Sequence, residues 1–140
     1  MNHLSRVNSF LTKTTPFIYS NGRCDFNITL NTDVLKDASK EFTAATIYHE
    51  IVHAYLRTSG VTGYDLQHNA IAAEYESKLE SSLKSLFPNL SDLDAKSLSW
   101  GGLMDTPAWA DFKAKNPSQA QDMEVANSQR RVHTKGTPCN

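Results

Sequence analysis

The chain has 140 residues, of which 39% are hydrophobic and 21% charged, which is the size and composition of one globular domain without room for a second. Its 14 Lys and Arg stand against 15 Asp and Glu, so the formal net charge of −1 gives no overall positive field to hold nucleic acid or an anionic membrane. No stretch approaches the roughly 18 apolar residues of a membrane span, and the first residues lack a basic segment followed by an apolar one.

We therefore expect one soluble domain over residues 1–140, with no nucleic acid and no membrane as partner. A cytoplasmic location and export as part of a larger protein are both compatible with these features, and the oligomeric state is left open. Two cysteines, Cys24 and Cys139, are too few for a disulfide framework and allow one optional disulfide.

The first predicted element is a β-hairpin. A short segment, residues 17–20, is followed by Asn21-Gly22, a pair that readily adopts the positive φ angles of a tight two-residue turn. From Cys24 to Leu30, apolar and polar residues alternate, which places the apolar set on one face of a strand. This strand is expected to be half buried.

A long helix is predicted from about Ser39 to Thr58, with Gly60 placed to end it. Its apolar residues recur at intervals of three and four, and His49 and His53 share their face. The apolar members of this face are Phe42, Ala45, Val52 and Leu56. Both histidines are therefore expected to point inward.

A second long helix is predicted from about Tyr64 to Phe87, ending before Pro88. His68 begins a row of residues at helical spacing, so it should face the core and the first helix. The other members of this row are Ala72, Tyr75, Leu79 and Leu86.

Short helices are expected after Pro88. A possible capping box, Ser91 with Asp94, begins the first of them and Gly101-Gly102 ends it, while Thr106-Pro107 and Asn116-Pro117 each resemble an N-cap followed by proline. Residues 131–140 include Gly136 and Pro138, which oppose a regular element, and are expected to form a mobile tail. A small basic cluster, Arg130, Arg131 and Lys135, would be solvated there.

The strongest local signal is the HExxH pattern of residues 49–53. Residues four apart lie one turn apart on the same side of a helix, so His49 and His53 can chelate one ion with Glu50 beside it. In a zinc peptidase with this motif, the glutamate takes a proton from the water that the metal activates. The alternative is a helix with two partly buried, hydrogen-bonded histidines.

A third zinc ligand is expected from the second helix. We prefer His68 to Glu74, because six residues on a helix rotate Glu74 about 120° away from His68, onto the side with Ile71 and Lys78. The predicted Zn²⁺ site is therefore His49, His53 and His68.

Two other features are candidates for the site. Tyr75 lies on the His68 face and could donate a hydrogen bond to a developing oxyanion, although a core tyrosine would have the same spacing. Residues 98–106, with Trp100 and two glycines, could form one wall of a cleft or could only end a helix.

The segment from Ile28 to Tyr75 resembles the SprT-like zincin group, which includes the Spartan proteases. The resemblance is carried by HExxH, its continuation Ala54-Tyr55-Leu56, and His68 with fourteen residues between it and His53. It implies a small α+β fold, zinc on the three histidines and Glu50 as catalytic base. Members usually have glycine where Asn69 stands, and no cysteine-rich zinc module or basic extension follows here. A weaker resemblance, in general pattern alone, is to compact domains of bacterial secreted or toxin-like proteins.

We therefore expect a single-domain α+β zincin metallopeptidase, with a small N-terminal hairpin packed on the HExxH helix and on a second metal-bearing helix. The expected reaction is peptide-bond hydrolysis through a metal-activated water with Glu50 as general base. A polypeptide substrate would add as a strand at the edge of residues 24–30. The alternatives are a non-catalytic zinc-stabilised binding module, a DNA-linked SprT-like protease, and a helical protein without metal.

Overall fold

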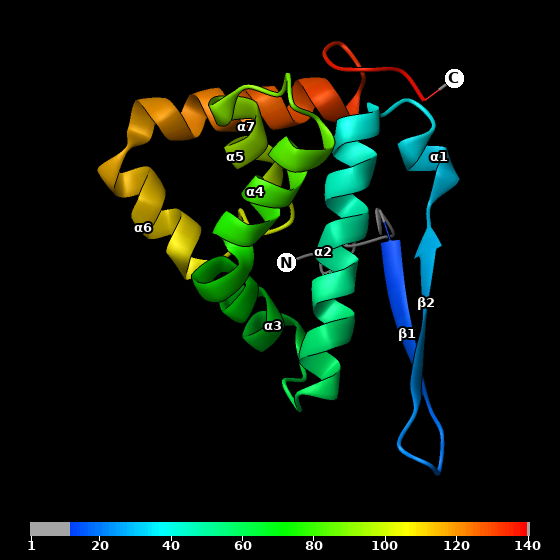
Figure 1. Ribbon diagram of the computed structural model, residues 1–140. Helices are drawn as coiled ribbons and strands as arrows, with labels where there is room; N and C mark the ends of the chain where they lie inside the picture. Colours follow the sequence, from blue (N-terminus) through cyan, green and yellow to red (C-terminus); the bar gives the residue numbers. More distant parts are fainter. Residues whose placement is uncertain (1–11, 140) are drawn as a thin grey trace, which may run out of the picture.

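The fold is described by a computed structural model over residues 12–139. The first element of this part of the chain is a β-hairpin (Figure 1). Strand β1 (Thr12–Ile18) pairs antiparallel with β2 (Cys24–Leu30), with Thr14 opposite Ile28. Together with the helices that follow, this two-stranded sheet gives the α+β fold that the sequence predicts.

The turn of the hairpin differs from the predicted one. Of Asn21 and Gly22, the two residues of the predicted turn, only Gly22 has a positive φ, 81°. The Gly22 N–H donates to the Tyr19 carbonyl over 3.0 Å, and the Tyr19 N–H donates to the Arg23 carbonyl over 2.8 Å. The hairpin therefore has a three-residue loop, because one left-handed glycine after an ordinary turn closes the strands without forcing Asn21 into the left-handed region.

Helix α2 (Lys40–Thr58) follows a single helical turn, α1 (Thr32–Leu35), and stands between the hairpin and the remaining helices (Figure 1). Its N-cap is Ser39, whose Oγ accepts the Phe42 N–H over 3.1 Å. The predicted inward face is confirmed, since Phe42, His53 and Leu56 are buried.

The predicted second helix is divided into three parts. They are α3 (Tyr64–Ala70), a π-helical turn η1 (Ile71–Tyr75) and α4 (Glu76–Leu86). A π turn adds a residue to the helical repeat and shifts every later residue around the axis. Leu83 is consequently buried whereas Leu86 is 51% exposed. Ile71, the first residue of the turn and expected on the outer side, is completely buried. The predicted inward position of Leu86 is therefore wrong.

Three more helices complete the fold. α5 (Asp92–Ser99) is capped by Ser91 and α6 (Pro107–Lys115) by Thr106, as predicted. The last one, α7 (Pro117–Arg131), is longer than the short helix expected. Two apolar clusters pack against α2. One contains Phe42 and Leu83 and the other contains Leu56 and Trp100, so residues near both ends of α2 are part of the core. No helix formed by residues 12–139 combines the length and apolar character that a membrane span requires.

The segment after α7 differs from the mobile tail that the sequence predicts, because it bonds to α2 and α5. The Lys40 N–H donates to the Thr137 carbonyl over 2.8 Å, and the Thr137 hydroxyl donates to Glu41 Oε1 over 2.7 Å. Lys135 Nζ donates to Asp94 Oδ1 over 2.8 Å. The partners are buried carboxylates on distant helices, which no pattern within residues 131–140 reveals. Cys24 and Cys139 are both free thiols.

The basic cluster also differs from the solvated patch expected. Arg130 is 6% exposed, with Nη2 3.1 Å from Asp94 Oδ2 and Nη1 3.4 Å from Glu41 Oε2. Burial alone would raise the pKa of both carboxyl groups, but hydrogen bonds from Thr137 to Glu41 and from Lys135 to Asp94 outweigh it and hold both pKa values below their ordinary range.

These lowered pKa values predict acid sensitivity. The stability that Glu41 and Asp94 contribute is complete above their ordinary pKa values of 4.5 and 3.8, and is lost as the pH falls through the lower values of the folded state. Asp94→Asn should lower the free energy of unfolding at pH 7 by on the order of 3 kcal/mol, and its difference from the parent protein should shrink towards pH 3. Urea unfolding at both pH values measures this, with the exposed Asp111→Asn as control. A constant difference would contradict it.

Candidate metal centre

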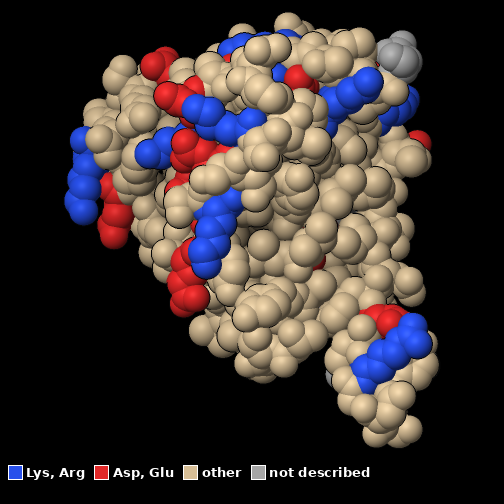
Figure 2. Space-filling view, viewed as in Figure 1, with Lys and Arg blue, Asp and Glu red and all other residues tan. Residues whose placement is uncertain are grey.

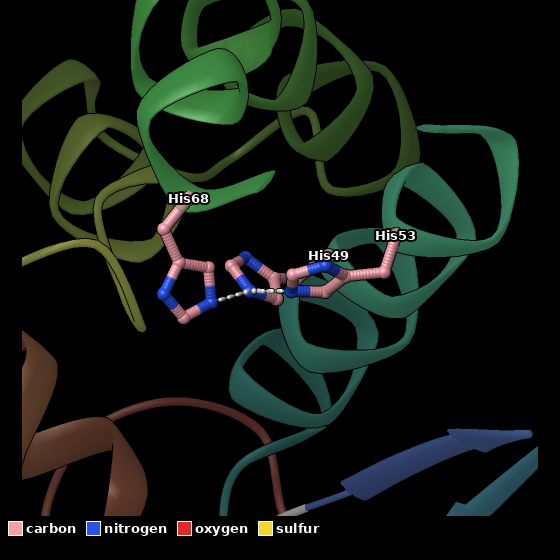
Figure 3. Close-up of side chains that lie close together, drawn as sticks. All are labelled: His49, His53 and His68. Atoms are coloured by element: carbon pink, nitrogen blue, oxygen red, sulfur yellow. Dashed lines mark hydrogen bonds between the residues drawn. The ribbon is translucent and has the colours of Figure 1, made fainter. Parts of the chain in front are cut away.

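Three histidine side chains from two elements converge on one point (Figure 3). His49 and His53 lie on successive turns of α2, and His68 faces them from α3. His49 Nε2 lies 2.9 Å from His53 Nε2 and 3.3 Å from His68 Nε2, and the three potential ligand atoms all lie within 4.8 Å of one another. Two nitrogens on one tetrahedral zinc ion, each at about 2.0–2.1 Å from it, are about 3.3 Å apart. The spacing therefore fits a shared ion.

The protonation of the cluster also suits a metal. Burial, followed by the charges of His53 and His68, lowers the pKa of His49 to about 3. Burial likewise lowers the pKa of His53 and of His68. All three imidazoles are therefore neutral near pH 7, and the neutral ring is the form whose nitrogen binds a metal ion.

Gln67 fixes the tautomer of His53, a role that the sequence alone does not predict. Its Oε1 lies 2.8 Å from His53 Nδ1, while its Nε2 donates to the Val61 carbonyl over 2.8 Å. A carbonyl oxygen only accepts, so the proton of neutral His53 is on Nδ1 and the lone pair is on Nε2. The 4% exposure of Gln67 makes this orientation part of the core. A glutamine beside His68 carries no spacing signal of its own.

Tyr64 and Asp105 surround His68 and were also missed. The Tyr64 ring meets the His68 ring edge to face with centroids 4.0 Å apart, and its hydroxyl donates to Asp105 Oδ2 over 2.9 Å. Asp105 Oδ1 lies 4.0 Å from His68 Nδ1. The negative charge of Asp105 partly opposes the lowering of the His68 pKa by burial. At 4.0 Å Asp105 acts on His68 through its charge and makes no hydrogen bond to it.

The segment between α5 and α6 lies beside the three histidines, as expected if it forms one wall of a cleft. Gly102 has a φ of 81°, and a Cβ on it would lie 3.2 Å from His49 Cε1. Both the backbone conformation and the close approach therefore favour glycine at this position. Asp105 brings the end of the same segment to His68.

Glu50 lies beside the histidines and is tied to the sheet. Thr14 of β1 donates from Oγ1 to Glu50 Oε2 over 2.5 Å, and Arg57 Nη1 donates to the Thr14 carbonyl over 2.9 Å. The charge of Glu50 acts on His53 and His68, where it opposes the effect of burial on the pKa. The hairpin thus anchors the carboxylate of the HExxH motif where its charge acts on two of the potential ligands.

The remaining candidates lie elsewhere. Tyr75 contacts Tyr55, with ring centroids 6.1 Å apart, and Lys78, whose Nζ is 4.8 Å from the ring centre. No described contact joins it to the histidines, so its oxyanion role stays a prediction. Glu74 is exposed and, within residues 12–139, stands outside the group of converging ligand atoms.

Comparison of the chain with models of known protein families, with curated proteins and with solved structures finds no match.

The bond between Gln67 and His53 predicts an effect on metal affinity. Gln67→Leu keeps the approximate volume but leaves His53 Nδ1 without its acceptor, so the affinity for zinc should fall about 10- to 100-fold. Gln67→Glu keeps an acceptor and should recover part of this loss. Competition with a chromophoric chelator measures the affinity, and Gln121→Leu, at an exposed position of α7, is the control. Equal affinities for Gln67→Leu and the parent would contradict the role.

Proposed function

We propose that this protein is a zinc-dependent metallopeptidase that holds one zinc ion with His49, His53 and His68 and uses Glu50 as general base. The observation that carries the proposal is the convergence of three imidazole nitrogens on a helix whose Glu50 carboxylate is anchored by Thr14. A zinc ion bound there would polarise the scissile carbonyl and lower the pKa of a water molecule towards neutrality.

The residues of the chain have separate tasks in this reaction. The three histidines supply uncharged ligands, so the positive charge of the ion is not cancelled by them. Glu50 accepts the proton of the attacking water and returns it to the leaving amine. Thr14 positions Glu50 by its hydrogen bond, and Arg57 fixes Thr14 in turn.

The number of ligands favours catalysis over a structural zinc site. Structural zinc is usually enclosed by four protein ligands, whereas catalytic zinc has three and leaves one position for water or substrate. Within residues 12–139 the converging group contains three histidines. The resemblance of residues 28–75 to the SprT-like zincins supports the same assignment, and we propose that the chain belongs to that group.

We propose polypeptide as the substrate and hydrolysis that does not depend on DNA. Two residues of the basic cluster, Arg130 and Lys135, pair with buried carboxylates. On the face that Figure 2 shows, basic and acidic side chains lie next to one another. Neither feature provides the unpaired positive surface that phosphate binding needs.

An extended substrate would approach β1 in preference to the β2 edge expected from the sequence. Thr14, the residue bonded to Glu50, belongs to β1, and β1 lies nearer to α2 than its antiparallel partner β2 does (Figure 1). The tip of the hairpin stands apart from the body of the molecule (Figure 2). An added strand reads mainly the substrate backbone, so this contact would tolerate many sequences.

Removal and return of the metal tests the proposal. We expect the zinc-free protein to leave an unfolded polypeptide intact and one equivalent of zinc to restore hydrolysis, with or without DNA, because neutral histidines rebind the ion at pH 7. His49→Ala, purified in the same way, controls for contaminating proteases. A protein that binds zinc but cleaves no polypeptide would instead be the zinc-stabilised binding module, and cleavage that requires DNA would restore the DNA-linked alternative.

A further inference from the structure

A cavity of about 290 Å³ lies directly beside the metal centre, between the start of α3 and the segment that leads into α6. His68 lines it together with Tyr64, Asp65 and Asp105. Binding sites for drug-sized ligands measure about 300–1,000 Å³. The volume of this cavity is just below that range and suits a single side chain.

The walls of the cavity favour a cation. Asp65 and Asp105 contribute two carboxylates, and the residues that line it include no lysine or arginine. The Tyr64 hydroxyl, 2.9 Å from Asp105 Oδ2, holds one of these carboxylates in place. The Tyr64 ring, 58% exposed at the same wall, can add a cation–π contact. Carboxylate and aromatic groups attract the same kind of ligand, an ammonium or a guanidinium.

A second observation comes from His68 itself. This residue is 5% exposed, yet its Nδ1 is buried without a hydrogen-bond partner among the described residues. When Nε2 holds a metal, Nδ1 carries a proton that needs an acceptor. The nearest carboxylate oxygen, Asp105 Oδ1, is 4.0 Å away, which is too far for a hydrogen bond. The site therefore lacks an acceptor at the position where the cavity meets the metal centre.

We propose that this cavity binds the positively charged side chain of a lysine or arginine that adjoins the scissile bond of a polypeptide substrate. The side chain provides the cation for Asp65 and Asp105, and the substrate backbone provides a carbonyl acceptor for His68 Nδ1. This inference rests on the proposed peptidase function, because only a substrate placed at the histidines reaches the cavity in this way. It makes the enzyme selective for basic residues, although strand addition alone would not be selective.

Binding to the zinc-loaded Glu50→Gln protein tests the cavity without turnover. The probes are short fluorescent peptides, acetylated and amidated at their ends, with one central arginine or with citrulline, which has nearly the same shape and no charge. A third probe has citrulline and a free amino terminus. We expect the arginine peptide to bind about three- to tenfold more tightly than either citrulline peptide, and added salt to reduce this preference.

Asp65→Asn in the same background should abolish most of the preference, and Asp122→Asn, at an exposed position of α7, should keep it. Asp105→Asn is the second variant, with its zinc content measured separately because Asp105 adjoins His68. Equal binding of the arginine peptide and the acetylated citrulline peptide would overturn the inference. Tightest binding of the peptide with the free amino terminus would overturn the side-chain assignment as well.

The two proposals fail in different ways. If the zinc-loaded parent protein hydrolyses the arginine and citrulline peptides equally well and the binding shows no preference, the cation site is wrong and the peptidase stands. If no peptide is hydrolysed but the arginine preference and its loss in Asp65→Asn are found, the peptidase is wrong, and the cavity is a cation site for binding without hydrolysis.

Discussion

Replacing His53 with alanine is expected to lower the affinity for zinc by more than about 100-fold, because loss of a direct ligand should exceed the 10- to 100-fold effect of an outer partner. His53 is 8% exposed, is oriented by Gln67, and has its Nε2 2.9 Å from that of His49. His49→Ala should have an effect of the same size, since His49 Nε2 lies close to the Nε2 atoms of both other histidines. Chelator competition and metal analysis of the purified proteins measure the loss.

His68→Ala separates the two candidates for the third ligand. It should weaken zinc binding clearly, whereas Glu74→Ala, at an exposed position outside the histidine cluster, should bind zinc as the parent does. Circular dichroism of each variant shows whether the helices persist, so that a loss of metal is not confused with unfolding. Full zinc binding by His68→Ala together with its loss in Glu74→Ala would reverse the assignment.

The convergence of the three histidines could be predicted from the sequence because they lie where helical spacing is regular. His49 and His53 are one turn apart within the uninterrupted helix α2, and His68 lies in α3, before the π turn. Tyr75 is the last residue of that turn. A spacing of 3.6 residues per turn does not hold through this segment, which has more residues per turn, and Tyr75 packs against Tyr55.

The contacts around the site could not be predicted for a different reason. Gln67 bonds to a residue 14 positions away, and Thr14 reaches Glu50 across 36 positions. Such pairs depend on how α2 packs against the hairpin and α3, and a glutamine or a threonine has no periodic pattern that marks it as a partner. The same holds for Arg130. Its sequence context predicts an exposed cation, but it donates a hydrogen bond to Asp94, which lies 36 positions earlier in the chain.

Glu50→Gln is expected to leave zinc binding and folding unchanged while hydrolysis falls by about 10²- to 10⁴-fold, the usual contribution of a general base. The amide has nearly the shape of the carboxylate and can still accept the Thr14 hydroxyl, 2.5 Å from Oε2 in the parent protein. It cannot accept a proton from water. The loss should therefore appear in kcat and in kcat/KM together, without a matching change in KM.

The control for this variant is Glu74→Gln, the same chemical change at an exposed position of η1, which should retain full activity. Hydrolysis of an unfolded polypeptide is measured for both variants after each is loaded with one equivalent of zinc. Retained hydrolysis by zinc-loaded Glu50→Gln would exclude Glu50 as the base, and loss of zinc from it would make Glu50 a ligand.

The side chains of Glu50 and Thr14 meet across the boundary between α2 and β1. Thr14→Val should therefore also lower hydrolysis, but by a smaller factor than Glu50→Gln. The substitution disturbs the position of the base and leaves its proton affinity in place.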